Sequence, residues 1–182
     1  MKLTARRVSD KLLEWAFNGV VSRLPNRALG KSRIVMLRAM GAQIGHGVKV
    51  SRKVKVLGAR YLTIESGSAI AHSVVLDARG QLVIRSGALI GFESVLLTYT
   101  HAWPDPTRPV HTQGVSSAPV EIGALSWLGA RSFVLPGVTV GDSSVVGAGS
   151  VVTKSIPPMK VSAGVPARVV SDRTSRREQT GE

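Results

Sequence analysis

The stretch IGHGVKVSRKVKVLGARYLTIESGSAIAHSVVLDARGQ, residues 44–81, brings back a branched aliphatic residue at every sixth position, apart from a two-residue insertion at 62–63. The same rhythm runs on to residue 101 and resumes over 122–157, which gives fifteen hexapeptides in five groups of three. A six-residue period fits neither an α-helix nor simple strand alternation. It predicts short strands joined by tight corners.

Three such strands per turn predict a triangular prism, an all-β solenoid in which the first aliphatic residue of each hexapeptide points inward. Small residues are expected near the corners, among them Ser73, Gly87, Ser94 and Ser144. Stacked coils should lie about 4.8 Å apart, as strands do in a sheet. A β-sandwich is the alternative, but it predicts strands of varied length without a fixed six-residue return.

Composition agrees with one narrow, repetitive domain. The 182 residues are 43% hydrophobic but only 4% aromatic, so aliphatic side chains must build the core. The absence of cysteine excludes disulfides, a thiol nucleophile and thiolate metal ligands. Charged residues interrupt the apolar N-terminal stretch and no cleavage site follows it, so we expect a cytoplasmic protein.

Residues 1–42 precede the repeats and predict a helical, basic cap. A helix capped by Ser9 or Asp10 would run until Pro25, and a second helical turn or two around 31–40 would end at Gly41. These segments are expected to cover the open end of the first coil. An amphipathic anchor on a membrane surface is the sharper alternative, and both roles could hold.

Positive charge is concentrated at the same end of the chain. The formal net charge is +13, and residues 1–60 carry 14 lysines and arginines against two acids. Such a surface can face phosphates, anionic lipid or nucleic acid, or it can simply be solvated. No aromatic-interleaved basic groove accompanies it, so nucleic acid is the less favoured partner and peripheral contact with an anionic membrane is the prediction.

Three stretches carry a resemblance to a known family: LDARGQLVI (76–84), TYTHAWPDP (98–106) and VLPGVTVGDSSVVGAGSVVTKSIPPMKVSAGVPARVV (134–170). They resemble the hexapeptide-repeat acyltransferases, in particular the branch of maltose, galactoside and exopolysaccharide O-acetyltransferases. The resemblance implies a left-handed parallel β-helix of about five coils over residues 43–157, with a protruding loop at 102–119. Left-handedness comes from the family alone, because crossovers in general prefer the right-handed sense.

The resemblance also implies an assembly and a C-terminal contact. Family members are homotrimers with active sites in the clefts between subunits. The C-terminal extension, residues 158–182, is expected to touch the acyl donor at 163–168 and to be disordered beyond it.

The resemblance implies a catalytic role for His101. This residue closes the hexapeptide LLTYTH, where family members keep their general base. An imidazole can accept the proton of a hydroxyl while that oxygen attacks a thioester. The regular coil would then position the base, and the irregular loop would cover the acceptor.

The later coils imply the donor side of the site. Trp127, Gly129 and Ala130 match family residues beside the acyl group, with the Ala130 N–H stabilising the oxyanion. Plain packing is the alternative for Trp127. The match continues along the path of coenzyme A to Ala148, Thr153, Lys154, Ala163 and Arg168. Relatives often carry a further cation where this chain has Ser171, so either Arg173 substitutes for it or the contact is absent.

On the acceptor side the resemblance implies Asp77, with Ser73 and Glu93 as weaker candidates. Asp77 could accept a hydrogen bond from a sugar hydroxyl. It could equally be a corner aspartate satisfied by local backbone amides.

Together these features imply an O-acyltransferase that moves an acetyl or other short acyl group from acyl-CoA to a hydroxyl of a carbohydrate, glycolipid or exopolysaccharide precursor. Direct transfer in a ternary complex is favoured, because the chain has no thiol and no strong serine nucleophile motif. A catalytically silent scaffold is one alternative. A metal-dependent protein similar to the β-helical carbonic anhydrases is another, but their closely spaced histidine pair is missing, since His101 and His111 are ten residues apart; we expect no metal.

Overall fold

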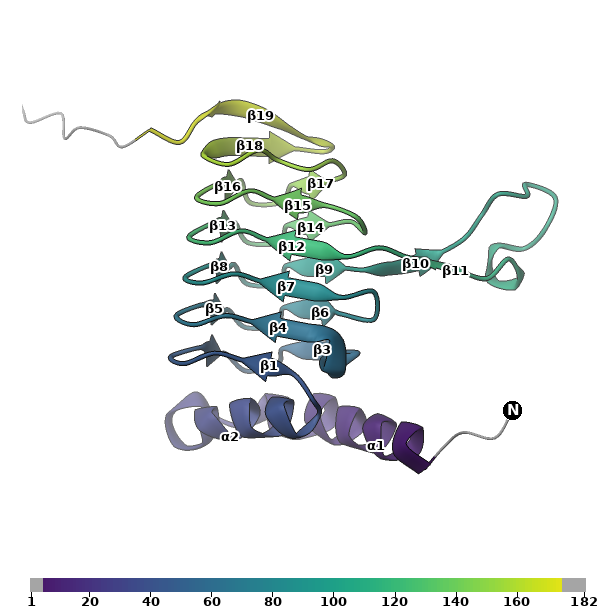
Figure 1. The fold of residues 1–182 in the computed structure, drawn as a ribbon, viewed down its shortest axis with the longest axis vertical. Coiled ribbons are helices and arrows are strands. Elements are labelled where there is room, and N and C mark those ends of the chain that lie inside the picture. Colours follow the sequence, from purple (N-terminus) through teal and green to yellow (C-terminus); the bar gives the residue numbers. More distant parts are fainter. Residues whose placement is uncertain (1–4, 175–182) are drawn as a thin grey trace, which may run out of the picture.

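The computed structural model describes residues 5–174 as a prism of stacked coils on a base of two helices (Figure 1). Each coil contributes one strand to each of three sheets. Sheet A contains β1 (Gln43–Ile44), β4 (Leu62–Ile64), β7 (Leu82–Ile84), β12 (Val120–Ile122) and β15 (Thr139–Val140). Sheet B contains β2 (Lys49–Val50), β5 (Ala69–Ile70), β8 (Leu89–Ile90), β13 (Trp127–Leu128), β16 (Val145–Val146), β18 (Lys160–Gly164) and β19 (Ala167–Asp172). Sheet C contains β3 (Lys55–Leu57), β6 (Val75–Asp77), β9 (Val95–Leu97), β14 (Phe133–Val134) and β17 (Val151–Val152).

The prism has five complete coils, as predicted, and the beginning of a sixth. In that sixth coil Ile156 bridges to Val140 and β18 pairs in parallel with β16. The chain then turns back, and β19 lies antiparallel on β18. The coils wind upward in the left-handed sense (Figure 1), which confirms the handedness that the family resemblance implies.

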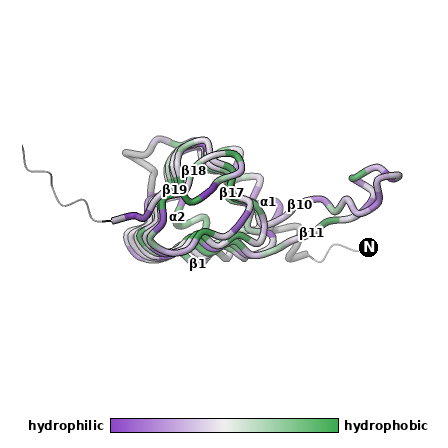
Figure 2. The backbone as a smooth tube through the Cα atoms, turned by 90° about the horizontal axis from the view of Figure 1, so that it is seen from above, coloured by the Kyte–Doolittle hydropathy of each residue, from purple (hydrophilic) through white to green (hydrophobic). Residues whose placement is uncertain are grey.

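Inward aliphatic side chains form continuous stacks along the axis of the prism. In sheet A, Ile44 pairs with Ile64, which pairs with Ile84, followed by Ile122 and Val140. All of them are buried in the core. Each such side chain contributes about 1.5–3 kcal/mol of hydrophobic free energy by leaving water. Figure 2, seen along this axis, shows the coils superimposed, so the six-residue period does build the predicted prism.

The corners use the small residues in two ways. Ser73 and Gly87 adopt the left-handed conformation, with φ of 60° and 69°, that the tight turn requires. Ser94 and Ser144 are buried inside the corners, where their hydroxyls donate to the carbonyls of Gly129 (3.1 Å) and Pro157 (2.8 Å). A larger side chain at either buried position would displace the neighbouring coil.

The base consists of α1 (Ala5–Gly19), the 3-10 turn η1 (Val21–Arg23) and α2 (Asn26–Ala39). Three predictions were wrong here: α1 begins before Ser9, it ends at Gly19 rather than at Pro25, and α2 has 14 residues rather than one or two turns. No proline interrupts either segment, and Pro25 lies between them as the residue that precedes α2. Phe17 and Leu37 are fully buried in the common core, so the helices do cap the first coil. Neither described helix has the length and apolar character needed to cross a bilayer.

The predicted loop at 102–119 is part of a longer arm that projects from the prism (Figure 1). β10 (Tyr99–His101) pairs antiparallel with β11 (Val115–Ser117), and η3 (Val110–Thr112) lies between them. The regular coil therefore ends at Leu97, not at His101 as the hexapeptide rhythm predicted. The cause is the buried Thr98, whose hydroxyl donates to the Asp77 carbonyl (2.6 Å) and accepts the Gly80 N–H (2.7 Å).

At the other end of the chain, the predicted disorder beyond residue 168 is wrong for 169–172. These residues continue β19, because they pair with β18 along the last coil. The remaining part of that prediction concerns residues 175–182, which lie outside the described residues.

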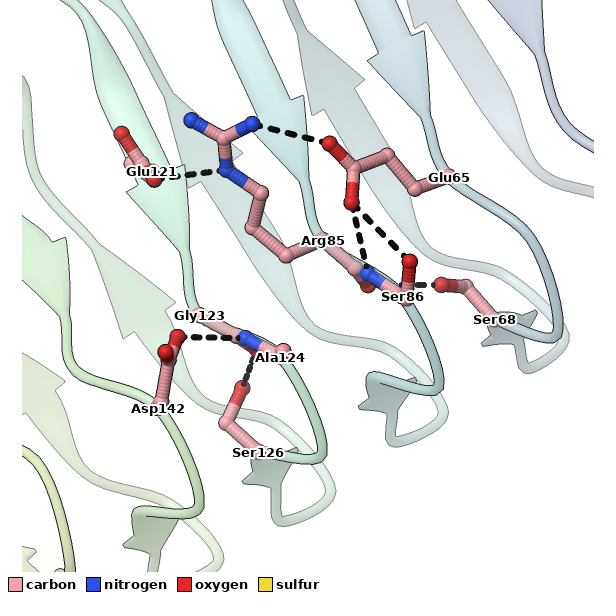
Figure 3. A network of polar contacts seen from close by, with 9 residues as sticks. All are labelled: Glu65, Ser68, Arg85, Ser86, Glu121, Gly123, Ala124, Ser126 and Asp142. Atoms are coloured by element: carbon pink, nitrogen blue, oxygen red, sulfur yellow. Dashed lines mark hydrogen bonds and ion pairs between the residues drawn. The ribbon is translucent and has the colours of Figure 1, made fainter.

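Sheet A carries a polar ladder that links three successive coils (Figure 3). Arg85 donates from Nη1 to Glu65 Oε1 at 2.8 Å and from Nε to Glu121 Oε1 at 2.7 Å. The Arg85 guanidinium lowers the pKa of Glu65, and the two carboxylates raise the pKa of Arg85. One coil farther on, Asp142 accepts the Ala124 N–H at 2.7 Å.

We expect Arg85→Gln to lower the free energy of unfolding by about 1 kcal/mol or less at neutral pH, because the ladder is partly exposed to water. The folded-state pKa of Glu65 is lowered, so its contribution is present above the ordinary value of 4.5 and is lost as the pH falls below it. Urea unfolding on both sides of that value should show a smaller acid-induced loss in the variant than in the wild type. Arg108→Gln on the arm is the control, and an unchanged pH dependence in the Arg85 variant would contradict the assignment.

Candidate active site

The edge where sheet B turns into sheet C carries five of the predicted site residues. We call residues 51–54, 71–74, 91–94, 129–132 and 147–150, one group per coil, the B–C edge. Hydrogen bonds stack these turns: the Glu93 N–H donates to His72 O (3.1 Å), and the Gly149 N–H donates to Ala130 O (2.8 Å). The edge therefore holds Ser73 and Glu93 below and Gly129, Ala130 and Ala148 above, in the order of the coils.

The Ala130 N–H is an unpaired donor on this edge. Within residues 5–174 it donates no hydrogen bond, whereas the Gly129 N–H donates to Val146 O (2.7 Å) and the Arg131 N–H to Phe92 O (2.9 Å). In the coil below, Gly91 leaves room for this peptide, because a Cβ at that position would lie 2.7 Å from Ala130 N. A fixed, unpaired N–H of this kind can stabilise negative charge on an oxygen.

Trp127 lies outside the prism on the adjoining face. It is the outward residue of β13, and its side chain is 48% exposed. Leu89 and Val145 flank it in the same outward row of sheet B. The ring therefore does not pack in the core of this chain.

The remaining donor candidates divide between two edges. Ala163 lies next to the uppermost turn of the B–C edge, because a Cβ added to Gly147 in that turn would lie 3.0 Å from the Cβ of Ala163. Ala163 is paired with the exposed Arg168 across the β18–β19 hairpin. Thr153 and Lys154, also exposed, follow β17 and lie where sheet C turns into sheet A. One chain therefore does not bring Lys154 to the B–C edge.

Arg173 does not replace the missing cation near the donor path. Its Nη1 donates to the carbonyls of Leu125 and Ser143, both at 3.0 Å. These two residues form turns between sheets A and B, so the guanidinium is held at a different edge of the prism. Ser171 itself pairs with Val161 in the terminal hairpin.

Asp77 has a local partner. Its side chain is 2% exposed, and Arg79 donates from Nε to Oδ1 at 2.9 Å and from Nη2 to Oδ2 at 2.6 Å. The hydrogen bond to Asp77 raises the pKa of Arg79, and the guanidinium lies 3.7 Å from the ring centroid of Tyr99 at the base of the arm. The structure favours the reading of a corner aspartate, with Arg79 as a residue that the sequence analysis missed. The sequence did contain a signal for this ion pair, namely an arginine two positions after the aspartate.

His101 ends β10 and is exposed on the arm. Figures 1 and 2 both show the arm projecting from the prism away from sheet B, which carries Trp127. His101 and Trp127 of one chain therefore lie on opposite sides of the molecule. A site that uses both residues needs a second copy of the chain.

The other histidines are dispersed. His46 and His72 are exposed on separate turns, and the ring of His72 stacks on Phe92 with centroids 5.2 Å apart. His111 lies in η3 on the arm. In the part of the chain that the structure describes, no three histidine or carboxylate side chains gather into a group that could hold a metal ion.

Comparison with known proteins agrees with this architecture. The family described as hexapeptide repeat of succinyl-transferase matches residues 119–154. The chain is 34% identical over 161 residues to the putative colanic acid biosynthesis acetyltransferase WcaF of Escherichia coli K12, covering 88% of this chain and 86% of the relative.

Two solved structures extend the comparison. The maltose O-acetyltransferase of Clostridium difficile 630 is similar with a TM-score of 0.81 and 25% identity, covering 93% of this chain and 87% of that one. A galactoside acetyltransferase in complex with coenzyme A is similar with a TM-score of 0.72 and 28% identity, covering 93% and 81%. The repeat, the fold and these similarities show that the chain belongs to the hexapeptide-repeat acyltransferases and is a coenzyme A-dependent acetyltransferase.

Proposed function

We propose that the protein transfers an acetyl group from acetyl-CoA to a hydroxyl of a carbohydrate acceptor, in a cleft formed by two copies of the chain. The observation that carries this proposal is the unpaired Ala130 N–H beside the exposed Trp127, on an edge that the chain's own arm does not approach. The arm of a neighbouring copy would bring His101 to that edge. The carbohydrate acceptor is supported by the names of the relatives, which act on maltose and galactosides or serve colanic acid biosynthesis.

In this mechanism His101 accepts the proton of the acceptor hydroxyl as its oxygen attacks the thioester carbonyl. The new C–O bond forms, and the carbonyl oxygen gains a negative charge that the Ala130 N–H stabilises. When the intermediate collapses, the C–S bond breaks and His101 returns the proton to the departing sulfur. Transfer is direct, so the histidine ends each cycle as it began.

The donor would lie along the B–C edge. Gly129, Ala148 and Ala163 present little or no side chain there, which leaves space for the pantetheine arm. Arg168, together with Thr153 and Lys154 of a second copy of the chain, would hold the phosphates, because exposed cations such as Arg168 and Lys154 suit an anionic ligand. Glu93 and Ser73, lower on the same edge, remain the predicted acceptor contacts.

We expect His101→Ala to lower kcat by roughly 10²–10⁴-fold, the usual contribution of positioned proton transfer. Folding should change little because the side chain is exposed, and coenzyme A affinity should change little because Trp127, Lys154 and Arg168 are proposed to hold the donor. His111→Ala, which removes the other histidine of the arm, is the matched control. Turnover like that of the wild type in a folded His101 variant would show that the histidine is not the base.

The outward faces of sheets B and C favour packing between copies. Leu89 and Phe133 are each 42% exposed, and Val95 and Val145 continue their rows, whereas Thr63, Glu121 and Thr139 make the outward row of sheet A largely polar. Exposed apolar rows of this kind prefer a partner. We therefore propose the homotrimer that the family resemblance implies.

Light scattering should give about three times 19.2 kDa. Co-expression provides a sharper measurement, because His101→Ala and Trp127→Ala remove residues from opposite sides of one chain. Mixed trimers should regain part of the activity that each variant lacks alone, since some clefts then contain both native residues. An active monomer, or no recovery in mixed trimers, would contradict the shared cleft.

We also propose that the base of the prism makes peripheral contact with an anionic membrane, on the inner face for a cytoplasmic protein. Leu12 and Trp15 are exposed on α1 and Val35 on α2, with Val20 exposed just after α1; Trp15 is 72% exposed. Lys11 and Lys31, both exposed on the helices, accompany them, and apolar residues beside cations are typical of helices that lie in the interface.

Co-sedimentation with liposomes should increase with the anionic lipid content and decrease with salt. Trp15→Ser should weaken binding several-fold, while Trp103→Ser, which removes an equally exposed ring from the arm, should not. Equal binding of neutral and anionic vesicles would leave capping as the only role of the helices.

A further inference from the structure

A groove lined by cations lies between the helical base and the first two coils. It has a volume of about 510 Å³, and its lining includes Asn18, Ser22, Arg23, Lys53, Lys55 and Ser73. Three of these residues are basic, and no aspartate or glutamate lines the groove. A cleft of this size suits a small ligand, and its charge selects an anion.

The three cations have no ionic partners in the protein. Among the described residues, Arg23, Lys53 and Lys55 form no ion pair. Higher on the same edge the charges are neutralised, since Arg131 pairs with Glu93 at 2.7 Å. The groove is therefore a place where positive charge is gathered and left uncompensated.

The frame that holds these cations is fixed by hydrogen bonds. The Asn18 side chain donates to Val56 O and accepts the Val56 N–H, both at 2.9 Å, which ties α1 to β3. The Lys53 N–H donates to Ser22 O at 2.6 Å, which ties the first corner to η1. The backbone that carries these cations is therefore fixed before a ligand binds, so binding requires little reorganisation of the protein.

The groove opens onto the B–C edge below the proposed reaction centre. On this edge Lys53 lies in the first coil, Ser73 in the second and Ala130 in the fourth. Two coils separate Ser73 from Ala130, a rise of about 10 Å at the usual strand spacing. A phosphorylated sugar has a comparable length, so its anionic end could occupy the groove while a hydroxyl reaches the thioester carbonyl beside the Ala130 N–H.

We infer that the acceptor is an anionic carbohydrate whose phosphate or diphosphate group binds among Arg23, Lys53 and Lys55; this inference rests on the proposed acetyl transfer. The groove supplies charged hydrogen-bond donors to the phosphate oxygens. The donor is recognised elsewhere, because Lys154 and Arg168 lie at the far end of the prism. The same groove accepts the phosphate of a soluble sugar phosphate, of a nucleotide sugar or of a lipid-linked sugar.

Matched acceptors test the inference. Acetylation should be measured with galactose, galactose 1-phosphate, UDP-galactose and a polyprenyl diphosphate-linked galactose in detergent. We expect kcat/KM to be at least about tenfold higher for a phosphorylated acceptor than for galactose, since one hydrogen bond to a charged group strengthens binding by about tenfold or more. The phosphorylated acceptor with the highest kcat/KM identifies the source of the phosphate.

The variant R23Q/K53Q/K55Q should lose this preference. Its kcat/KM for the phosphorylated acceptor should fall by roughly 10–100-fold, with galactose and coenzyme A affinity unchanged. Lys49→Gln is the control, because it removes an exposed cation of the same coil from sheet B, outside the groove. Equal kcat/KM for galactose and its phosphates, an equal loss for both acceptors in the variant, or weaker coenzyme A binding would each overturn the inference.

Calorimetry with inorganic pyrophosphate, without coenzyme A, separates this inference from the proposed function. The wild type and Lys49→Gln should bind pyrophosphate, and the triple variant should bind it at least about tenfold more weakly. If binding follows this pattern but no sugar is acetylated, the anion groove stands and the proposed carbohydrate transfer fails. If pyrophosphate binds equally to all three proteins, or to none, the groove is not an anion site.

Discussion

Each inward aliphatic side chain is buried only because the coils above and below supply most of its contacts. The stack in sheet A from Ile44 to Val140 shows this constraint, since every member is paired in register with its counterpart one coil away. A single coil has too little apolar surface to be stable alone. The prism must therefore be closed at both ends, and the buried Phe17 and Leu37 at the base and the β18–β19 hairpin at the top meet that requirement.

The same stacking creates the chemistry at the edges. A corner that turns within a few residues leaves at least one peptide N–H per coil without a partner on the B–C edge, among them those of His72, Phe92, Ala130 and Ala148 in the described part of the chain. The fold thus supplies a row of unpaired donors, and the proposed mechanism uses the one at Ala130 because of its surroundings. At Ala130 the neighbouring Trp127 is exposed and the side chain is small, whereas at Phe92 and His72 two stacked rings cover the edge.

Much of the fold followed from the sequence because the period is local information. The inward positions, the corners and the five coils depend only on spacing along the chain. The start of the arm at Thr98 did not follow, because it depends on hydrogen bonds to Asp77 and Gly80, about twenty residues away. The length of α2 was missed because its apolar face is defined by packing under the first coil rather than by strong caps.

The candidate site was predictable as a set of residues but not as an arrangement. Motif resemblance named His101 and Trp127, yet only the structure separates them onto opposite sides of one chain. Charge counting located the basic residues in the first third of the sequence without showing that some face outward on the helices and others line a groove. Arg23 belongs to the groove, while Trp15 marks the exposed face of the same base. If the acceptor is lipid-linked, these two surfaces serve one event, because the helices that we propose to contact the membrane also form one wall of the groove proposed to bind its phosphate.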